Sequence, residues 1–132
     1  MDKTQRQRLG VQKWINNKGN GIWVWSTGVG KSFGALMACV KLLKIRPDAK
    51  ILISVPTTIL KEQWLRDVAK TKFFGNVTVE VINSILKKSW EVDFLIIDEL
   101  HTAVSEQSIK IFDQVKYDFF LGLTATLERL DG

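Results

Sequence analysis

Short apolar runs alternate along this chain with longer stretches of helical periodicity. Residues 22–25 are an uninterrupted apolar segment of β-favouring residues, which suits a strand that is buried on both faces inside a parallel sheet. Residues 51–55, which are apolar apart from Ser54, and residues 94–97 repeat this short buried-strand pattern. Residues 77–82 alternate like a further strand, and residues 119–123 form another short apolar run. The pattern therefore predicts five strands.

The stretches between these runs have the spacing of helices. Residues 31–45 are apolar nearly all round until two lysines appear in the last turns, and Pro47 ends this helix. Residues 103–115 also have helical spacing, and residues 2–14 suit a short amphipathic helix that the Asn- and Gly-rich residues 16–21 break. A further helix after Pro56 has these residues on one face: Leu60, Trp64, Leu65 and Val68.

Strands that alternate with helices, without two-residue hairpin turns between them, predict a particular fold class. Such a chain needs right-handed crossovers, which place parallel strands in one open sheet and helices on both of its faces. We therefore expect a three-layer α/β/α fold. The chain contains no internal repeat, low-complexity tract or linker, and its 132 residues are interpreted as one domain, residues 1–132.

Composition narrows the class of protein further. The chain is 45% hydrophobic with five Trp and seven Phe, which can supply a sizeable core. No apolar run approaches the roughly 18 residues of a membrane span, and residues 1–8 are polar rather than signal-like. We therefore expect a soluble, intracellular protein (cytoplasmic, or in the host cytoplasm if phage-encoded) without a membrane partner. Cys39, the single cysteine, lies in an apolar run and is expected to pack as a small hydrophobe.

The charge balance is basic. Nineteen Lys and Arg against fourteen Asp and Glu give a net charge of +5 and a sequence pI near 9.4. This is compatible with a polyanionic partner, but many proteins of this charge never bind nucleic acid. The charge therefore only supports other arguments.

A Gly-rich turn between the first strand and the first long helix has the pattern of a phosphate-binding loop. Its glycines let successive backbone N–H groups face a phosphate at the positive end of the helix dipole. The lysine would reach the β- and γ-phosphates of a nucleotide, and the following serine hydroxyl would ligate Mg²⁺. The strict pattern asks for Gly where this chain has Trp25, and such a turn can also be purely structural. The residues of the turn are Ser26, Thr27, Gly28, Val29, Gly30, Lys31 and Ser32.

Two acids follow the apolar run at residues 94–97. They should lie at the carboxyl end of a strand, the edge where ligands bind in open parallel sheets and where the Gly-rich turn also lies. Asp98 would join Ser32 as a ligand of Mg²⁺, a hard cation that prefers oxygen. Glu99 would orient or deprotonate the attacking water. The alternative is that both acids simply cap the following helix.

These motifs resemble those of a known family. The Gly-rich turn, Asp-Glu-Leu-His at residues 98–101 and Thr-Ala-Thr at residues 124–126 have the order and spacing of motifs I, II and III of superfamily-two helicases of the DExH or DEAH-box type. In that superfamily the first P-loop position is often not Gly. The resemblance implies a RecA-like P-loop NTPase fold, with ATP and Mg²⁺ as cofactors. It also implies that His101 and the hydroxyls of Thr124 and Thr126 link the nucleotide site to nucleic-acid movement.

Further segments resemble the same family, and in particular DNA repair and phage recombination helicases. Residues 55–60 with Gln63 and Trp64 look like motif Ia, which contacts the nucleic-acid backbone, and residues 82–85 resemble the next contacting segment. Gln12 resembles the upstream Gln that reads adenine. Leu127 stands where DNA-directed members usually have Pro. The resemblance thereby assigns nucleic-acid contact to Pro56, Thr57, Thr58, Asn83 and Ser84.

The resemblance implies one half of a motor. The predicted function is an ATP-dependent helicase or translocase domain that hydrolyses ATP·Mg²⁺ weakly in isolation and contacts nucleic acid, with DNA favoured over RNA. A second RecA-like domain, in an untruncated chain or in trans, would supply the arginine finger, which contributes on the order of 10³ to 10⁵ in hydrolysis rate in other NTPases.

Two other classes of function stay open. One is a non-catalytic P-loop module that holds a nucleotide and gates a partner; Lys31, Ser32, Asp98 and Glu99 all count against it, because a decayed site would not need the Glu. The other is a P-loop kinase or transporter ATPase, which would not explain the motifs at residues 98–101 and 124–126.

The tryptophans pose a separate choice between base stacking and core packing. Trp23 and Trp25 fall on a buried strand and Trp64 on an apolar helix face, so core packing is favoured for these three. The sequence does not place Trp14 or Trp90.

Overall fold

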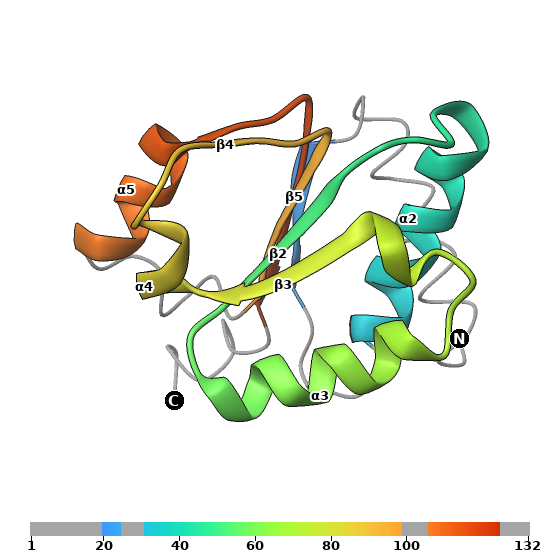
Figure 1. Ribbon diagram of the computed structural model, residues 1–132, viewed down its shortest axis with the longest axis horizontal. Helices are drawn as coiled ribbons and strands as arrows, with labels where there is room; N and C mark the ends of the chain where they lie inside the picture. Colours follow the sequence, from blue (N-terminus) through green and yellow to red (C-terminus); the bar gives the residue numbers. More distant parts are fainter. Residues whose placement is uncertain (1–19, 25–30, 99–105, 125–132) are drawn as a thin grey trace.

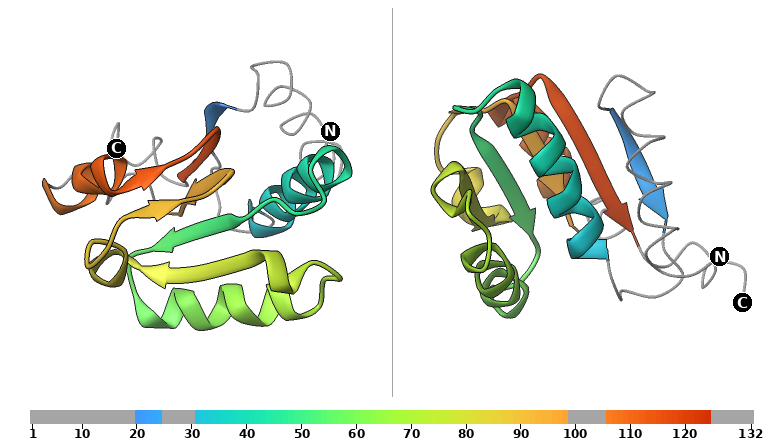
Figure 2. Two further views of the ribbon diagram at one scale, coloured as in Figure 1. Left: turned by 45° about the horizontal axis from the view of Figure 1, so that its top comes forward. Right: turned by 90° about the vertical axis from the view of Figure 1, so that its right-hand side faces the viewer.

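The main sheet of the molecule is parallel throughout and has five strands. The computed structural model describes residues 20–24, 31–98 and 106–124. The strand order is β1-β7-β5-β2-β3, so β5 and β7 lie between the two strands that come first in the chain (Figure 2). The strands are β1 (Asn20–Val24), β2 (Ile51–Val55), β3 (Val77–Val81), β5 (Phe94–Ile97) and β7 (Phe119–Thr124).

Helices cover both faces of this sheet. α2 (Lys31–Ile45) and α3 (Thr58–Ala69) pack against one face, and α4 (Ile82–Ile85) and α5 (Glu106–Gln114) against the other. In Figure 1 the sheet is seen nearly edge-on, with α2 and α5 on opposite sides of it. The predicted three-layer α/β fold is confirmed. No helix within the described part of the chain is both long and apolar enough to span a bilayer.

The core is divided by the sheet into two layers, as strand alternation requires. Ile51, Ile53 and Val55 of β2 point into the cluster with α2 and α3, whereas Leu52 points into the cluster with α4 and α5. All four residues of β5 are buried, because this strand has a neighbour on each side and helices on each face. Cys39 lies in the α2 layer, where burial raises the pKa of its thiol from 9.0 to about 12. It packs as a small hydrophobe, as expected.

The ends of α2 and α3 follow from local chemistry. The backbone N–H of Arg46 donates to the carbonyl of Leu42 at 2.8 Å, which continues the helical hydrogen-bond pattern by one residue. Pro47 then ends α2. Thr57 is the N-cap of α3, where its Oγ1 accepts a hydrogen bond from the N–H of Leu60 at 3.2 Å. A short 3₁₀ turn, η1 (Phe74–Asn76), leads from α3 into β3.

Several predicted boundaries were wrong. β1 begins at Asn20, so residues 20 and 21 belong to the strand rather than to the expected break. Leu65 is 42% exposed, because it lies off the stripe of α3 that packs on the sheet. The helix predicted at residues 103–115 ends at Gln114, one residue early, while residues 103–105 lie outside the described residues.

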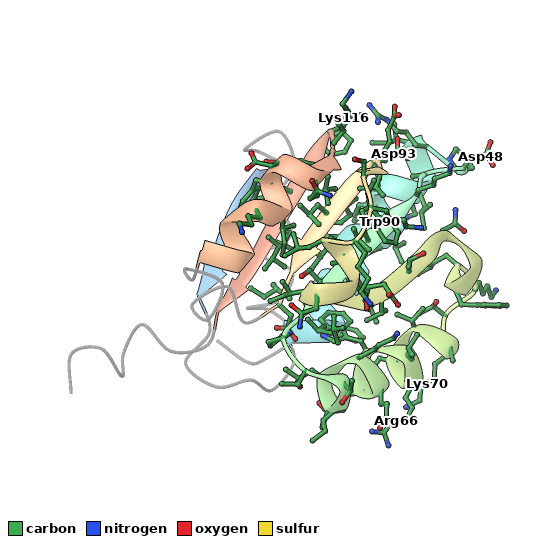
Figure 3. The ribbon with its side chains drawn as sticks, turned by 60° about the vertical axis from the view of Figure 1, so that its left-hand side comes forward. Asp48, Arg66, Lys70, Trp90, Asp93 and Lys116 are labelled. Carbon is green, nitrogen blue, oxygen red and sulfur yellow. The ribbon has the colours of Figure 1, made fainter. Side chains whose placement is uncertain are left out.

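A second, two-stranded parallel sheet was not predicted. It pairs β4 (Trp90–Glu91) with β6 (Val115–Lys116), so Val115 belongs to a strand and not to the preceding helix. Trp90, which the sequence left unplaced, donates its indole N–H to the carbonyl of Ile85 at 2.9 Å. The Lys88 ammonium also lies 4.1 Å from the centroid of the Trp90 ring. Trp90 is labelled in Figure 3. Strands of two residues have too little periodicity to be read from sequence.

Charged side chains tie together the edge of the sheet where β5 and β7 begin. Arg46 bonds to Asp93 at 3.2 Å and to Asp118 at 2.7 Å, and Asp93 also accepts from the N–H of Lys50 at 2.7 Å. These bonds, above all the one to Asp118, raise the pKa of the Arg46 guanidinium. We call Arg46, Asp93 and Asp118 the amino-edge cluster. Asp93 is labelled in Figure 3.

Candidate functional site

The described residues that border the sequence motifs lie at the carboxyl edge of the sheet. β1 ends at Val24 and β7 at Thr124, and these two residues are directly paired. Asp98 follows β5 immediately, and its N–H bonds to the carbonyl of Ser54 at 2.9 Å, which extends the β2–β5 ladder by one bond. α2 begins at Lys31, after the segment that follows β1. Because the strands are parallel, all these points lie at one edge, as the sequence predicted.

Asp98 is the best-defined polar group at this edge. It is only 3% exposed, and its Oδ2 accepts a hydrogen bond from the indole Nε1–H of Trp64 at 2.7 Å. Phe94 and Ile96, which precede it at alternate positions, point into the layer of α2 and α3. Asp98 continues that alternation, so it faces the same layer as α2.

This arrangement fits a site for Mg²⁺ and the phosphates of a nucleotide. Proteins usually bind Mg²⁺ through one or two carboxylates together with substrate phosphates and waters. Asp98 offers a carboxylate oxygen on the α2 side of the sheet. The 15-residue helix α2 starts at the same edge, where its dipole favours negative charge.

A polar groove lies at the same edge. It has a volume of about 270 Å³ and lies where the turn from β2 into α3 meets the turn from β3 into α4. Thr58 and Asn83, which line the groove, are exposed; of their sequence neighbours, Thr57 is exposed and Ser84 is half-buried. Two segments that the sequence assigned to nucleic-acid contact are therefore neighbours in space. The groove is lined by Pro56, Thr58, Val81, Ile82 and Asn83.

Comparison with known proteins identifies the family. The model of the family described as type III restriction enzyme, res subunit, matches residues 1–89 and 78–129 of this chain. The chain belongs to this family. A curated relative is the DNA 3'-5' translocase XPB2 of Sulfurisphaera tokodaii, 32% identical over 142 residues that cover 96% of this chain. The chain spans 31% of that protein's length.

Solved structures share the fold of this restriction-enzyme family member. The SWI2/SNF2 ATPase core of Sulfolobus solfataricus, solved with dsDNA, superposes with a TM-score of 0.73 at 18% identity and covers 92% of this chain and 31% of its own. The UvsW helicase of bacteriophage T4 superposes with a TM-score of 0.73 at 22% identity. The match covers 92% of this chain and 52% of the UvsW chain. The predictions of a RecA-like α/β fold and of a first motor domain of superfamily-two helicase type are confirmed.

Part of the predicted site lies outside the described residues. This holds for Gln12, Ser26, Thr27, Gly28, Val29, Gly30, Glu99, His101 and Thr126. For Lys31, Ser32 and Thr124 the structure gives the backbone position only. The roles of all these residues remain predictions.

Sequence reasoning predicted only one of the two kinds of contact that Trp64 makes. Trp64 does pack in the core, as predicted, but it also bonds to the candidate Mg²⁺ ligand Asp98. A signal existed: a carboxylate at the end of a buried strand needs a donor, and Trp is the apolar-looking residue that carries one. The strand order, which places α3 near β5, was the missing information.

Proposed function

We propose that this chain is the ATP-binding motor domain of a DNA-directed helicase or translocase. It binds ATP·Mg²⁺ at the carboxyl edge of the sheet and hydrolyses it slowly alone. It also contacts nucleic acid through residues 56–58 and 82–84. The observation that carries the proposal is the burial of Asp98 at the end of β5, on the α2 side and at the edge where α2 begins. Family membership supports the same conclusion.

In this proposal the nucleotide is held mainly by the segment between β1 and α2. The backbone N–H groups of residues 26–30 surround the phosphates, Lys31 contacts the β- and γ-phosphates, and Gln12 reads adenine. Ser32 and Asp98 hold Mg²⁺, which when bound neutralises the charge on the phosphates. Glu99 accepts a proton from the attacking water or orients it.

Nucleic-acid contact is proposed for the polar groove and its surroundings. Thr58 and Asn83 line the groove, and Thr57 and Ser84 are their neighbours in the sequence, so hydroxyl, amide and backbone groups lie close to one strip of surface. Such groups bind phosphate and sugar without reading sequence. His101, Thr124 and Thr126 would couple this surface to the nucleotide.

DNA is proposed over RNA on the names of the relatives. XPB2 is a DNA translocase, and the SWI2/SNF2 core was solved with dsDNA. The chain spans 31% of XPB2 and 52% of the UvsW chain. We therefore propose that a second RecA-like domain, in cis or in trans, closes on the nucleotide and supplies the arginine finger.

The test is ATP hydrolysis by the chain with and without single-stranded DNA, duplex DNA and RNA. We expect slow turnover, and we expect one or both forms of DNA to increase it more than RNA does. Lys31→Ala and Glu99→Gln should each lower turnover by about 100-fold or more. Lys44→Ala, an exposed change on the same helix as Lys31, is the matched control and should not alter turnover. Binding of ATP without any turnover would favour the nucleotide-gated binding module instead.

A further inference from the structure

The hydrogen bond between Trp64 and Asp98 joins two distant parts of the sequence inside the core. The two residues are 34 positions apart, the Nε1–Oδ2 distance is 2.7 Å, and each residue is 3% exposed. Trp64 belongs to α3, whereas Asp98 follows β5. A helix that begins at the groove thus bonds directly to the proposed Mg²⁺ ligand.

The chemistry of this pair fixes the orientation of the carboxylate. An indole N–H is a donor only, so Asp98 must present an oxygen to it as the acceptor. A hydrogen bond to an ionised carboxylate is shorter and stronger than a neutral one, and the 2.7 Å separation is within that range. The bond therefore restricts rotation of the Asp98 side chain about its last torsion.

The donor is itself held firmly in place. The Trp64 ring packs in the same buried cluster as Val68, one helical turn further along α3. α3 is fixed at its start by the Thr57 cap and tied to β3 by an ion pair between Lys61 and Glu80 at 2.7 Å. An indole ring has only two side-chain torsions, so it makes a rigid donor.

We propose that Trp64 is a positioning residue for the Mg²⁺ site: its indole N–H holds Oδ2 of Asp98 so that the carboxylate is presented to nucleotide-bound Mg²⁺. The inference rests on the proposed function. It assigns Trp64 a role in metal binding beyond that of core packing. Groups that orient metal ligands in this way typically contribute 10- to 100-fold to metal affinity.

The decisive variant is Trp64→Phe, which keeps an aromatic ring and removes the N–H. The matched control is Trp90→Phe, which removes an indole hydrogen bond to Ile85 on the opposite face of the sheet. For each protein, calorimetry gives the affinity for a non-hydrolysable ATP analogue in Mg²⁺ and in EDTA. We expect Trp64→Phe to reduce the Mg²⁺-dependent gain in affinity by about tenfold. The affinity in EDTA should stay within about twofold, and Trp90→Phe should change neither.

The outcomes separate this inference from the proposed function. If the wild-type chain gains affinity from Mg²⁺ and Trp64→Phe gains as much, the role of Trp64 is overturned and the proposed function stands. If the wild-type chain gains nothing from Mg²⁺, both are overturned. A double change, Trp64→Phe with Asp98→Asn, should lose no more Mg²⁺-dependent affinity than Asp98→Asn alone, because both act on one ligand.

A second measurement follows the indole N–H resonance of Trp64 by NMR in the wild-type chain, and it needs a variant only to assign that resonance. In the wild-type chain, the ¹H–¹⁵N resonance of the Trp64 indole should shift when Mg²⁺ is added to the nucleotide-bound protein, while the Trp90 resonance stays in place. This measurement can be made even if Trp64→Phe folds poorly. In that case the Trp64 resonance is assigned as the one left after Trp→Phe changes have assigned the other four indole resonances. A Trp64 resonance that is unmoved by Mg²⁺ would overturn the proposal.

Discussion

The two edges of the sheet handle charge in opposite ways. At the amino edge, Arg46 lies between Asp93 and Asp118, and the three side chains are 41%, 31% and 61% exposed. At the carboxyl edge, Asp98 is buried, and its carboxylate accepts a bond from the neutral indole of Trp64. The amino edge therefore pairs opposite charges at the surface, whereas the carboxyl edge holds a carboxylate in the core.

The difference separates holding the fold together from carrying out chemistry. Exposed ion pairs cost little and contribute modestly, so they suit a place where strand ends only need to be joined. A buried carboxylate is expensive in free energy and persists where a ligand of opposite charge will use it. We therefore expect changes at the amino edge to alter stability alone, and changes at Asp98 to alter function much more than stability.

The largest expected effect is that of Asp98→Asn on ATP turnover. The amide has nearly the same shape and can still accept from Trp64, but it removes the charged oxygen that Mg²⁺ prefers. Turnover should fall by roughly 100-fold or more, because such a ligand contributes several kcal/mol to the stabilisation of charge. The free energy of unfolding, measured with urea, should change much less than turnover, because the amide keeps the shape of the side chain and can still accept the bond from Trp64. A large loss of stability with unchanged turnover would reverse the assignment of the carboxyl edge.

The next effect is that of Asp93→Ala on stability. This change removes one of the two acceptors of Arg46 and the acceptor of the Lys50 backbone N–H, so the free energy of unfolding should fall by about 1–3 kcal/mol, while ATP turnover per folded molecule is unchanged. Asp48→Ala, an exposed change near this edge, is the matched control and should leave the free energy of unfolding within about 0.5 kcal/mol of wild type (Figure 3). If Asp93→Ala and Asp48→Ala behave alike in urea, the amino-edge cluster has no stabilising role.

How far the sequence predicted the fold depended on periodicity. The bounds of β2, β5 and α2 were predicted correctly, because each is a dense apolar segment between clear breaks such as Pro47. The sheet of β4 and β6 was missed, because strands of two residues carry no period and their pairing depends on tertiary contacts. The exposure of Leu65 was missed because the width of the buried stripe on α3 depends on how the helix lies on the sheet.

The site was predictable where it followed chain order and not where it depended on packing. That Asp98, the start of α2 and the end of β7 share one edge follows from parallel strands alone. The partnership of Trp64 with Asp98, and of Arg46 with Asp118, joins residues 34 and 72 positions apart. No local pattern encodes such contacts, because they depend on which strands become neighbours.

The smallest expected effect concerns salt, and it sharpens the contrast between the edges. Asp118→Asn should lower the free energy of unfolding by about 0.5 kcal/mol at low ionic strength, since its bond to Arg46 is exposed. The loss should nearly vanish in 1 M NaCl, where the Debye length is about 3 Å. The buried control is Trp64→Phe, whose loss of stability should be the same at both salt concentrations, because its bond to Asp98 is buried and has an uncharged donor. If the loss of stability in Asp118→Asn does not depend on salt, Asp118 acts through packing or backbone contacts. The amino-edge cluster would then not stabilise the fold through its ion pairs.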